Sequence, residues 1–105
     1  MKKILMSALS MGILSVSAQA ACTSTGCYDV TVDKLFVTKT GTIYVGTSGD
    51  EKILPCGALG GTYIILPTGV AQNQLYSMLL TAQTTKRKIN IKVDTGTYCP
   101  IAYMF

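Results

Sequence analysis

The sequence contains no histidine and no tryptophan, and only five of its 105 residues are acidic. Histidine supplies the general bases and metal ligands of many enzymes, so its absence removes the commonest catalytic and metal-binding arrangements. A phosphate-binding loop is also missing, because the glycine-rich residues 57–61 do not follow the G-x-G-x-x-G pattern between a strand and a helix. These absences predict a protein that is not an enzyme and that uses no cofactor or metal.

The five carboxylates give little basis for catalysis. Asp29 and Asp33 lie four positions apart in a predicted strand and could share a face, as a paired-carboxylate hydrolase requires. Asp50 and Glu51 fall in a predicted turn, and Asp94 follows another predicted strand. We interpret all five as solvated strand and turn residues, and a weak enzyme using Asp29 and Asp33 stays open as the lesser alternative.

The first twenty residues have the pattern of a secretory signal peptide. Lys2 and Lys3 precede a short apolar run, and an Ala-x-Ala cleavage site follows it and ends at Ala20. The run is too short to span a membrane, and no second long apolar run follows it. The sequence therefore predicts a signal peptide over residues 1–20 and a single soluble domain over residues 21–105 that is secreted or periplasmic.

Four cysteines, Cys22, Cys27, Cys56 and Cys99, lie in this predicted domain of 85 residues. So small an exported domain buries a marginal core and commonly needs disulfides. Among the three pairings that four cysteines allow, we favour Cys56–Cys99 with Cys22–Cys27. A zinc site is disfavoured because there is no histidine and no C-x2-C pair. Lipidation of Cys22 is a further alternative, although it would leave an odd number of cysteines.

The charge is close to balanced once the leader is removed, with seven basic and five acidic residues. This balance is far from the basic surface of a nucleic-acid-binding domain, so no nucleic-acid partner is expected. Residues 86–88, Lys-Arg-Lys, could attract a phosphate or an anionic glycan. We interpret them instead as the soluble end of a helix, where cations offset the helix dipole.

Hydrophobic periodicity predicts mainly strands. Alternation indicates strands over residues 28–33, 43–46, 53–54, 62–66, 89–93 and 98–105, and it slips over residues 34–37, where we expect a β-bulge or a bend. One helix is predicted between residues 68 and 88, with Thr68 as its N-cap. Its apolar face comprises Ala71, Leu75, Met78, Leu79 and Ala82.

The predicted order places one helix between the third and fourth main strands. This is the order of the OB-fold, a small five-stranded and partly open barrel, and the helix would plug one end of it. The fold class is therefore expected to be mainly β with one helix, and a plain α+β sheet with one helix is the alternative.

Tyrosine is the best candidate for ligand contact, because its ring offers an apolar face and a hydroxyl. Tyr44 faces away from Ile43 and Val45 in its predicted strand, so it is the tyrosine expected to be exposed. Three polar residues close to it in the sequence could supply hydrogen bonds. The candidate glycan-binding residues are Tyr44, Thr47, Ser48 and Lys52.

Two stretches carry a family resemblance. The segment GTIYVGT before Cys56, and QLYSMLLTAQTTKRKINIKVD before Cys99, resemble the B subunits of AB5 toxins of the subtilase-cytotoxin type, over about residues 35–99. The matching helix positions are Tyr76, Leu79, Leu80 and Ala82. The resemblance implies an OB-fold, a ring-shaped homopentamer, cell-surface glycans as ligands and a toxin A subunit as a further partner. Many relatives carry another cysteine at the start of this helix, and this sequence does not.

Together these features predict a secreted, non-catalytic glycan-binding subunit. The alternative is an exported protein-binding domain, such as a hydrolase inhibitor or a surface adaptor.

Overall fold

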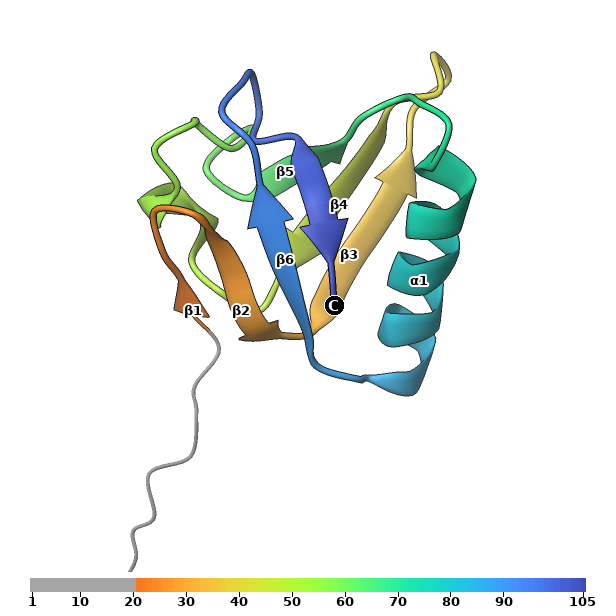
Figure 1. The fold of residues 1–105 in the computed structure, drawn as a ribbon, viewed down its shortest axis with the longest axis horizontal. Helices are drawn as coiled ribbons and strands as arrows, with labels where there is room; N and C mark the ends of the chain where they lie inside the picture. Colours follow the sequence, from red (N-terminus) through yellow and green to blue (C-terminus); the bar gives the residue numbers. More distant parts are fainter. Residues whose placement is uncertain (1–20) are drawn as a thin grey trace, which may run out of the picture.

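The computed structural model describes residues 21–105, and the predicted signal peptide over residues 1–20 lies outside them. The described chain is mainly β with one α-helix, as the sequence predicts (Figure 1). Its elements are β1 (Ala21–Cys22), β2 (Gly26–Val30), β3 (Val32–Val37), β4 (Ile43–Thr47), the 3-10 helix η2 (Glu51–Ile53), β5 (Tyr63–Leu66), α1 (Gln72–Thr85), β6 (Ile89–Val93) and β7 (Ile101–Met104).

The strands form two antiparallel sheets. One sheet has the order β1-β2-β6-β7, and the other has the order β3-β4-β5. The two sheets do not close into a barrel through continuous ladders. They are linked beyond the ladders by a parallel bridge between Ile65 and Pro100, where the Ile65 amide donates to the Tyr98 carbonyl at 3.0 Å.

The chain passes from one sheet to the other at Thr31, between β2 and β3. The ladder is irregular on both sides of this point, between Cys27 and Val30 and again between Val32 and Lys34. Extra residues in one strand of a ladder bend it, which accounts for the change of sheet. The predicted bulge or bend is therefore present. It begins before residues 34–37, the position at which the slip in alternation predicted it.

The core lies between the two sheets and under the helix. Val30, Val45, Ile64 and Ile91 are fully buried and come from both sheets. The helix contacts β3 and β5 and lies beside β3 in the fold (Figure 1). At about 25 cal/mol per Å² of apolar surface, burial of each such side chain stabilises the fold by about 1.5–3 kcal/mol.

Both favoured disulfides are present. Cys22 pairs with Cys27, and Cys56 pairs with Cys99. The second bridge joins the loop after η2 to the turn before β7, two segments 43 positions apart in the sequence. Disulfides persist in oxidising compartments, so both bridges fit a protein that works outside the cytoplasm.

Several local predictions are wrong. Residues 53–54 do not form a strand, because Asp50 accepts a hydrogen bond from the Lys52 amide and caps the short helix η2. Thr68 does not cap α1. The helix begins one turn later, after a turn closed by the Gln72 amide and the Gly69 carbonyl. Met78 is 46% exposed, so it does not belong to the buried face.

The buried stripe of α1 is consequently narrow. Leu79 and Ala82 are buried, Leu75 is half-buried, and Ala71 lies outside the helix and is exposed. No helix within residues 21–105 is long and apolar enough to cross a lipid bilayer.

Candidate functional site

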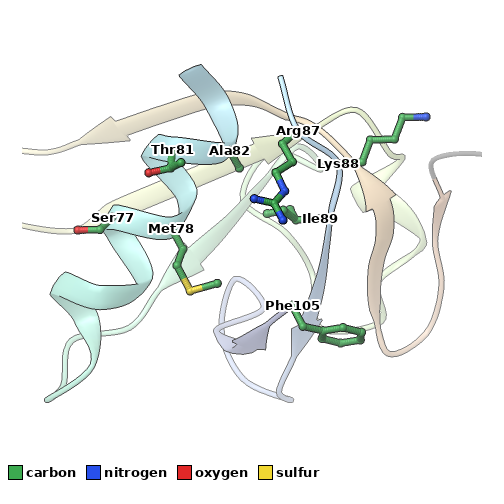
Figure 2. A pocket seen from close by; sticks show the side chains of 8 residues that line it. All are labelled: Ser77, Met78, Thr81, Ala82, Arg87, Lys88, Ile89 and Phe105. Atoms are coloured by element: carbon green, nitrogen blue, oxygen red, sulfur yellow. The ribbon is translucent and has the colours of Figure 1, made fainter. Parts of the chain in front are cut away.

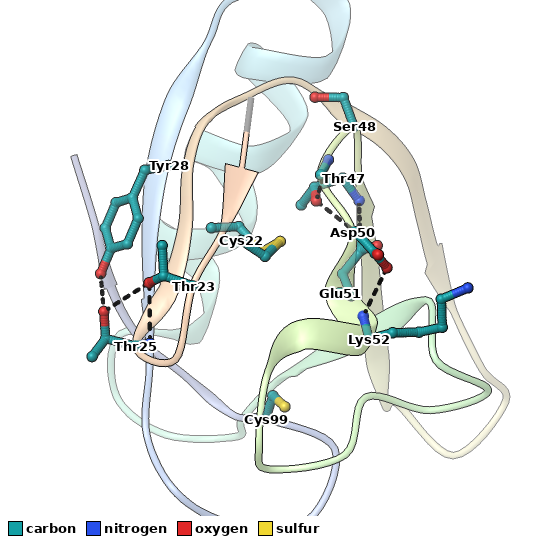
Figure 3. The surroundings of a disulfide bond; sticks show 12 residues. Cys22, Thr23, Thr25, Tyr28, Thr47, Ser48, Asp50, Glu51, Lys52 and Cys99 are labelled. Carbon is teal, nitrogen blue, oxygen red and sulfur yellow. Dashed lines mark hydrogen bonds between the residues drawn. A yellow bond between two sulfur atoms is a disulfide. The ribbon is translucent and has the colours of Figure 1, made fainter. Parts of the chain in front are cut away.

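Three of the four predicted glycan-binding residues lie close together around one turn: Thr47 ends β4, Ser48 follows it in the turn, and Lys52 lies in η2 (Figure 3). Thr47 is only 7% exposed, and its amide and its hydroxyl both donate to the Glu51 carboxylate, the hydroxyl at 2.8 Å. Ser48 and Lys52 are exposed, and Ser48 Oγ accepts a hydrogen bond from the Thr31 amide at 3.0 Å. Thr47 therefore holds the turn together and does not face a ligand.

Tyr44 does not share a surface with Thr47. Side chains alternate along a strand, so two residues three positions apart point to opposite faces of the sheet. Ile43, Val45 and Thr47 are buried on the inner face of β4, and Tyr44 is half-buried on its outer face. The structure thus separates Tyr44 from the residues that its position in the sequence placed beside it.

Tyr44 belongs to a different group, which we call the aromatic face. It consists of Phe36 on β3, Tyr44 on β4, Tyr63 on β5 and Tyr98 in the turn before β7. The Phe36 ring stacks on Tyr44 with centroids 5.3 Å apart and meets Tyr63 edge-on at 5.1 Å. Tyr44 in turn meets Tyr98 edge-on at 6.5 Å. These distances lie within the range of attractive aromatic pairs.

The strand register brings these rings together. Phe36 is directly opposite Tyr44 in the β3–β4 ladder, and Tyr63 is directly opposite Gly46 in the β4–β5 ladder. A Cβ atom at Gly46 would lie 3.2 Å from the Tyr63 ring. A glycine inside a strand marks such a close approach, so Gly46 leaves the space in which the Tyr63 ring reaches Phe36.

Tyr98 is held on the face by its backbone. Tyr98 and Cys99 both have positive φ, 62° and 54°, which side chains with a Cβ seldom adopt. The Tyr98 carbonyl accepts from Ile65 on β5, and the fully buried Cys99 is bonded to Cys56. Strained backbone persists where its surroundings fix it, and it clusters at functional sites. These contacts position the Tyr98 ring beside Tyr44.

A polar turn borders the aromatic face. Thr38, Thr40 and Thr42 lie between β3 and β4, and their hydroxyls form a chain, with Oγ1 atoms 2.9 Å and 3.4 Å apart. Each hydroxyl has one donor and two acceptor positions, so the chain leaves unused capacity for a ligand. Because side chains alternate along a strand, Thr38 lies on the same face of the sheet as Phe36, and Thr42 lies on the same face as Tyr44.

One basic residue adjoins the same face. The Cβ of Lys34 would lie 3.4 Å from a Cβ at Gly46, which places Lys34 beside the aromatic rings. No group of three or more histidine, cysteine, aspartate or glutamate residues within residues 21–105 could hold a metal ion. The site therefore offers ring faces, hydroxyls and one ammonium group for contact with a ligand.

Sequence reasoning found one member of this face and missed the others. Phe36, Tyr63 and Tyr98 come from three separate segments. The register between strands places Phe36 against Tyr44 and Tyr63 against Phe36, and Tyr98 meets Tyr44 from a turn. The one local signal was Gly46 within a strand, because a glycine at such a position often marks a place where another group approaches the strand closely. No family model matches this chain, and neither does any curated protein or solved structure.

Proposed function

We propose that this protein is an exported, non-catalytic carbohydrate-binding module and that the aromatic face is its binding site. The observation that carries the proposal is the contiguous group of Phe36, Tyr44 and Tyr63 on the outer face of one sheet, with Tyr98 beside them from the turn before β7. Aromatic rings present a negative face, which attracts the C–H groups of a sugar ring. The tyrosine hydroxyls and the threonine turn can then bind the sugar hydroxyls.

The finer fold assignment belongs to this proposal. We take β2 and β3 together as the first strand of an OB-fold, followed by β4 and β5, the helix, and β6 and β7. The parallel bridge between Ile65 and Pro100 supports it, because it links the third and fifth of these strands. OB-folds bind oligosaccharides on the face of their second and third strands and on the loops after the first and fourth. Tyr44, Tyr63, Tyr98 and the threonine turn occupy those positions.

The lack of catalysis is also an inference. All four cysteines are in disulfides, so none can serve as a nucleophile. The sequence has no histidine, and Asp29, one of the two carboxylates considered for hydrolysis, forms an ion pair with Lys88 at 3.8 Å. Asp33 instead accepts a hydrogen bond from the Thr31 hydroxyl at 2.9 Å. These contacts support a binding role.

The toxin resemblance implies a homo-oligomer with five copies in a ring. Such an oligomer would raise the overall affinity for a cell-surface glycan. A shallow site of a few rings binds one sugar weakly, and several linked sites raise the overall affinity by about 10²–10⁴ through effective concentration. Export through the predicted leader would place such an oligomer in the periplasm or outside the cell. Light scattering of residues 21–105 tests the oligomer, and an A subunit would be sought by co-purification.

A glycan array tests the binding proposal. We expect oxidised protein comprising residues 21–105 to bind a restricted set of glycans, and Tyr44→Ala to lose this binding. Tyr103→Ala is the matched control, because Tyr103 is 52% exposed but lies on β7, away from the aromatic face. Absence of binding to every glycan, or equal losses in the two variants, would contradict the proposal.

An exported protein-binding domain is the second candidate. It is favoured by Phe36, which contacts two other rings and is still 38% exposed, as an aromatic anchor at a protein interface can be in the free protein. Tyr44→Phe separates the two functions. Removal of the hydroxyl should weaken sugar binding, whereas binding to an apolar protein surface should survive this change and fail in Phe36→Ala.

A further inference from the structure

A cavity lies on another part of the molecule, between α1 and the start of β6 (Figure 2). Its volume is about 280 Å³. Its apolar lining consists of Met78 and Ala82 from the helix, Ile89 from β6, and Phe105 after β7. Phe105 is fixed there by two backbone hydrogen bonds with Asn90, at 2.8 Å and 3.0 Å. The cavity therefore has walls from three segments that are anchored by secondary structure.

Arg87 supplies the charge of this cavity. Its side chain lies over Ile89 and points into the space between the helix and β6, whereas Lys88 also lines the cavity but extends its ammonium end away from Arg87 (Figure 2). Lys88 is the partner of Asp29, and among residues 21–105 no carboxylate lies within 4.0 Å of the Arg87 guanidinium. The Arg87 amide donates to the Ala82 carbonyl at 3.0 Å, which holds its backbone against the end of α1.

Two hydroxyls stand on the helical wall. Ser77 and Thr81 both line the cavity and are one helical turn apart, so they lie on the same side of α1, and their hydroxyl oxygens point away from Arg87 (Figure 2). No acidic side chain lines the cavity. The lining thus combines an apolar floor with two basic residues, of which Arg87 points into the cavity, and its charge is positive.

From this combination we propose that the cavity binds a small amphipathic organic anion, with a carboxylate on Arg87 and an apolar body against Met78, Ile89 and Phe105. A guanidinium binds a carboxylate through two parallel hydrogen bonds. A cavity of about 280 Å³ has room for an apolar body no larger than a short chain or one ring. Inorganic phosphate would leave the apolar floor in contact with water.

This site is independent of the proposed carbohydrate site. Its residues come from α1, β6 and the C-terminal segment, whereas the aromatic face comes from β3, β4, β5 and the turn before β7. Failure of either proposal therefore leaves the other unaffected.

Sodium octanoate is a suitable probe, and 1-octanol is its neutral counterpart with the same chain length. The protein, residues 21–105 with both disulfides intact, is labelled with ¹⁵N and titrated while amide NMR signals are recorded. We expect saturable shifts confined to residues 77–82, 87–90 and 105, with a Kd of about 1 mM for a ligand of this size. Octanol should bind about tenfold more weakly, because it cannot form the charge-assisted bonds.

Two matched variants test the role of charge. Arg87 and Lys88 are both exposed, so neither Arg87→Gln nor Lys88→Gln is expected to prevent folding. Arg87→Gln should weaken octanoate binding about tenfold, and Lys88→Gln should change it less than twofold. The proposal is overturned if octanoate does not saturate, if octanol binds equally well, or if both variants behave alike. It is also overturned if the same signals shift only with protein concentration, since the cavity would then be a contact between copies.

Discussion

Removal of the Cys56–Cys99 bridge should cost more stability than removal of Cys22–Cys27. A disulfide acts chiefly by restricting the unfolded chain, and its contribution grows with the length of the loop that it closes. The two bridges close loops with sequence separations of 43 and 5. The chain-entropy relation then gives about 4 kcal/mol for Cys56–Cys99 and about 2 kcal/mol for Cys22–Cys27.

The assay compares two double alanine variants with the parent by thermal unfolding. In a domain of this size a change of 1 kcal/mol shifts the Tm by about 5 °C. We therefore expect the Cys56→Ala/Cys99→Ala variant to melt about 20 °C below the parent, and the Cys22→Ala/Cys27→Ala variant about 10 °C below. Urea unfolding provides the free energies directly.

The two variants should also differ in binding. Cys99 follows Tyr98, so loss of its bond removes one of the contacts that hold the Tyr98 ring beside Tyr44. Glycan binding should weaken in the Cys56→Ala/Cys99→Ala variant at a temperature where both variants remain folded. Equal losses of stability, or a larger loss in the Cys22→Ala/Cys27→Ala variant, would refute the account based on loop length.

Three further substitutions have defined outcomes. Glu51→Ala should destabilise the fold by about 2 kcal/mol in urea unfolding, because the buried Thr47 amide loses its acceptor; Glu51→Gln keeps a carbonyl oxygen there and should restore most of this loss. Gly26→Ala should prevent folding or lower the Tm by more than 10 °C, about 2 kcal/mol or more, since its Cβ would overlap the Ile91 carbonyl oxygen; a parent-like circular dichroism melt would contradict this. Lys88→Gln should change stability by less than about 1 kcal/mol, as its ion pair is exposed, and a larger loss would show that the pair is stronger than its geometry implies.

Local patterns were sufficient for much of the fold. Alternation over residues 89–93 matches β6, and the β-branched and aromatic run before Pro67 matches β5. Disulfides were expected from the size and compartment of the domain, and the pairing that we favoured among three is present in the structure. The strands were predicted from the residues of a single segment, and the disulfide pairing had to be chosen from only three possibilities.

Predictions failed where a local pattern competed with a hydrogen bond or a neighbouring element. The apolar pair at residues 53–54 resembled a short strand, but capping by Asp50 favours a 3-10 turn. Met78 fits the apolar helical period, yet it lies beside the Arg87 cavity and remains half exposed. The helical periodicity of apolar residues shows which side chains share one face of the helix. It does not show which neighbouring element covers that face.

The candidate site depended on information that a single sequence does not contain. Tyr44 was identified from alternation, whereas Thr47 was grouped with it by nearness in sequence, and strand geometry points the two in opposite directions. The ring that does contact Tyr44 across the sheet, Phe36, and the Tyr63 ring that contacts Phe36 in turn, come together only through the ladder register. Register is set by pairing between distant segments, so periodicity within one strand cannot reveal it.

The most direct test of the central claim is an aromatic NMR titration with a glycan selected on the array. A sugar stacked on the aromatic face should shift the ring protons of Phe36, Tyr44 and Tyr63 together, in saturable fashion, and leave those of Tyr103 unchanged. If the selected glycan binds and shifts only Tyr103 or other rings outside the aromatic face, the proposed site is wrong.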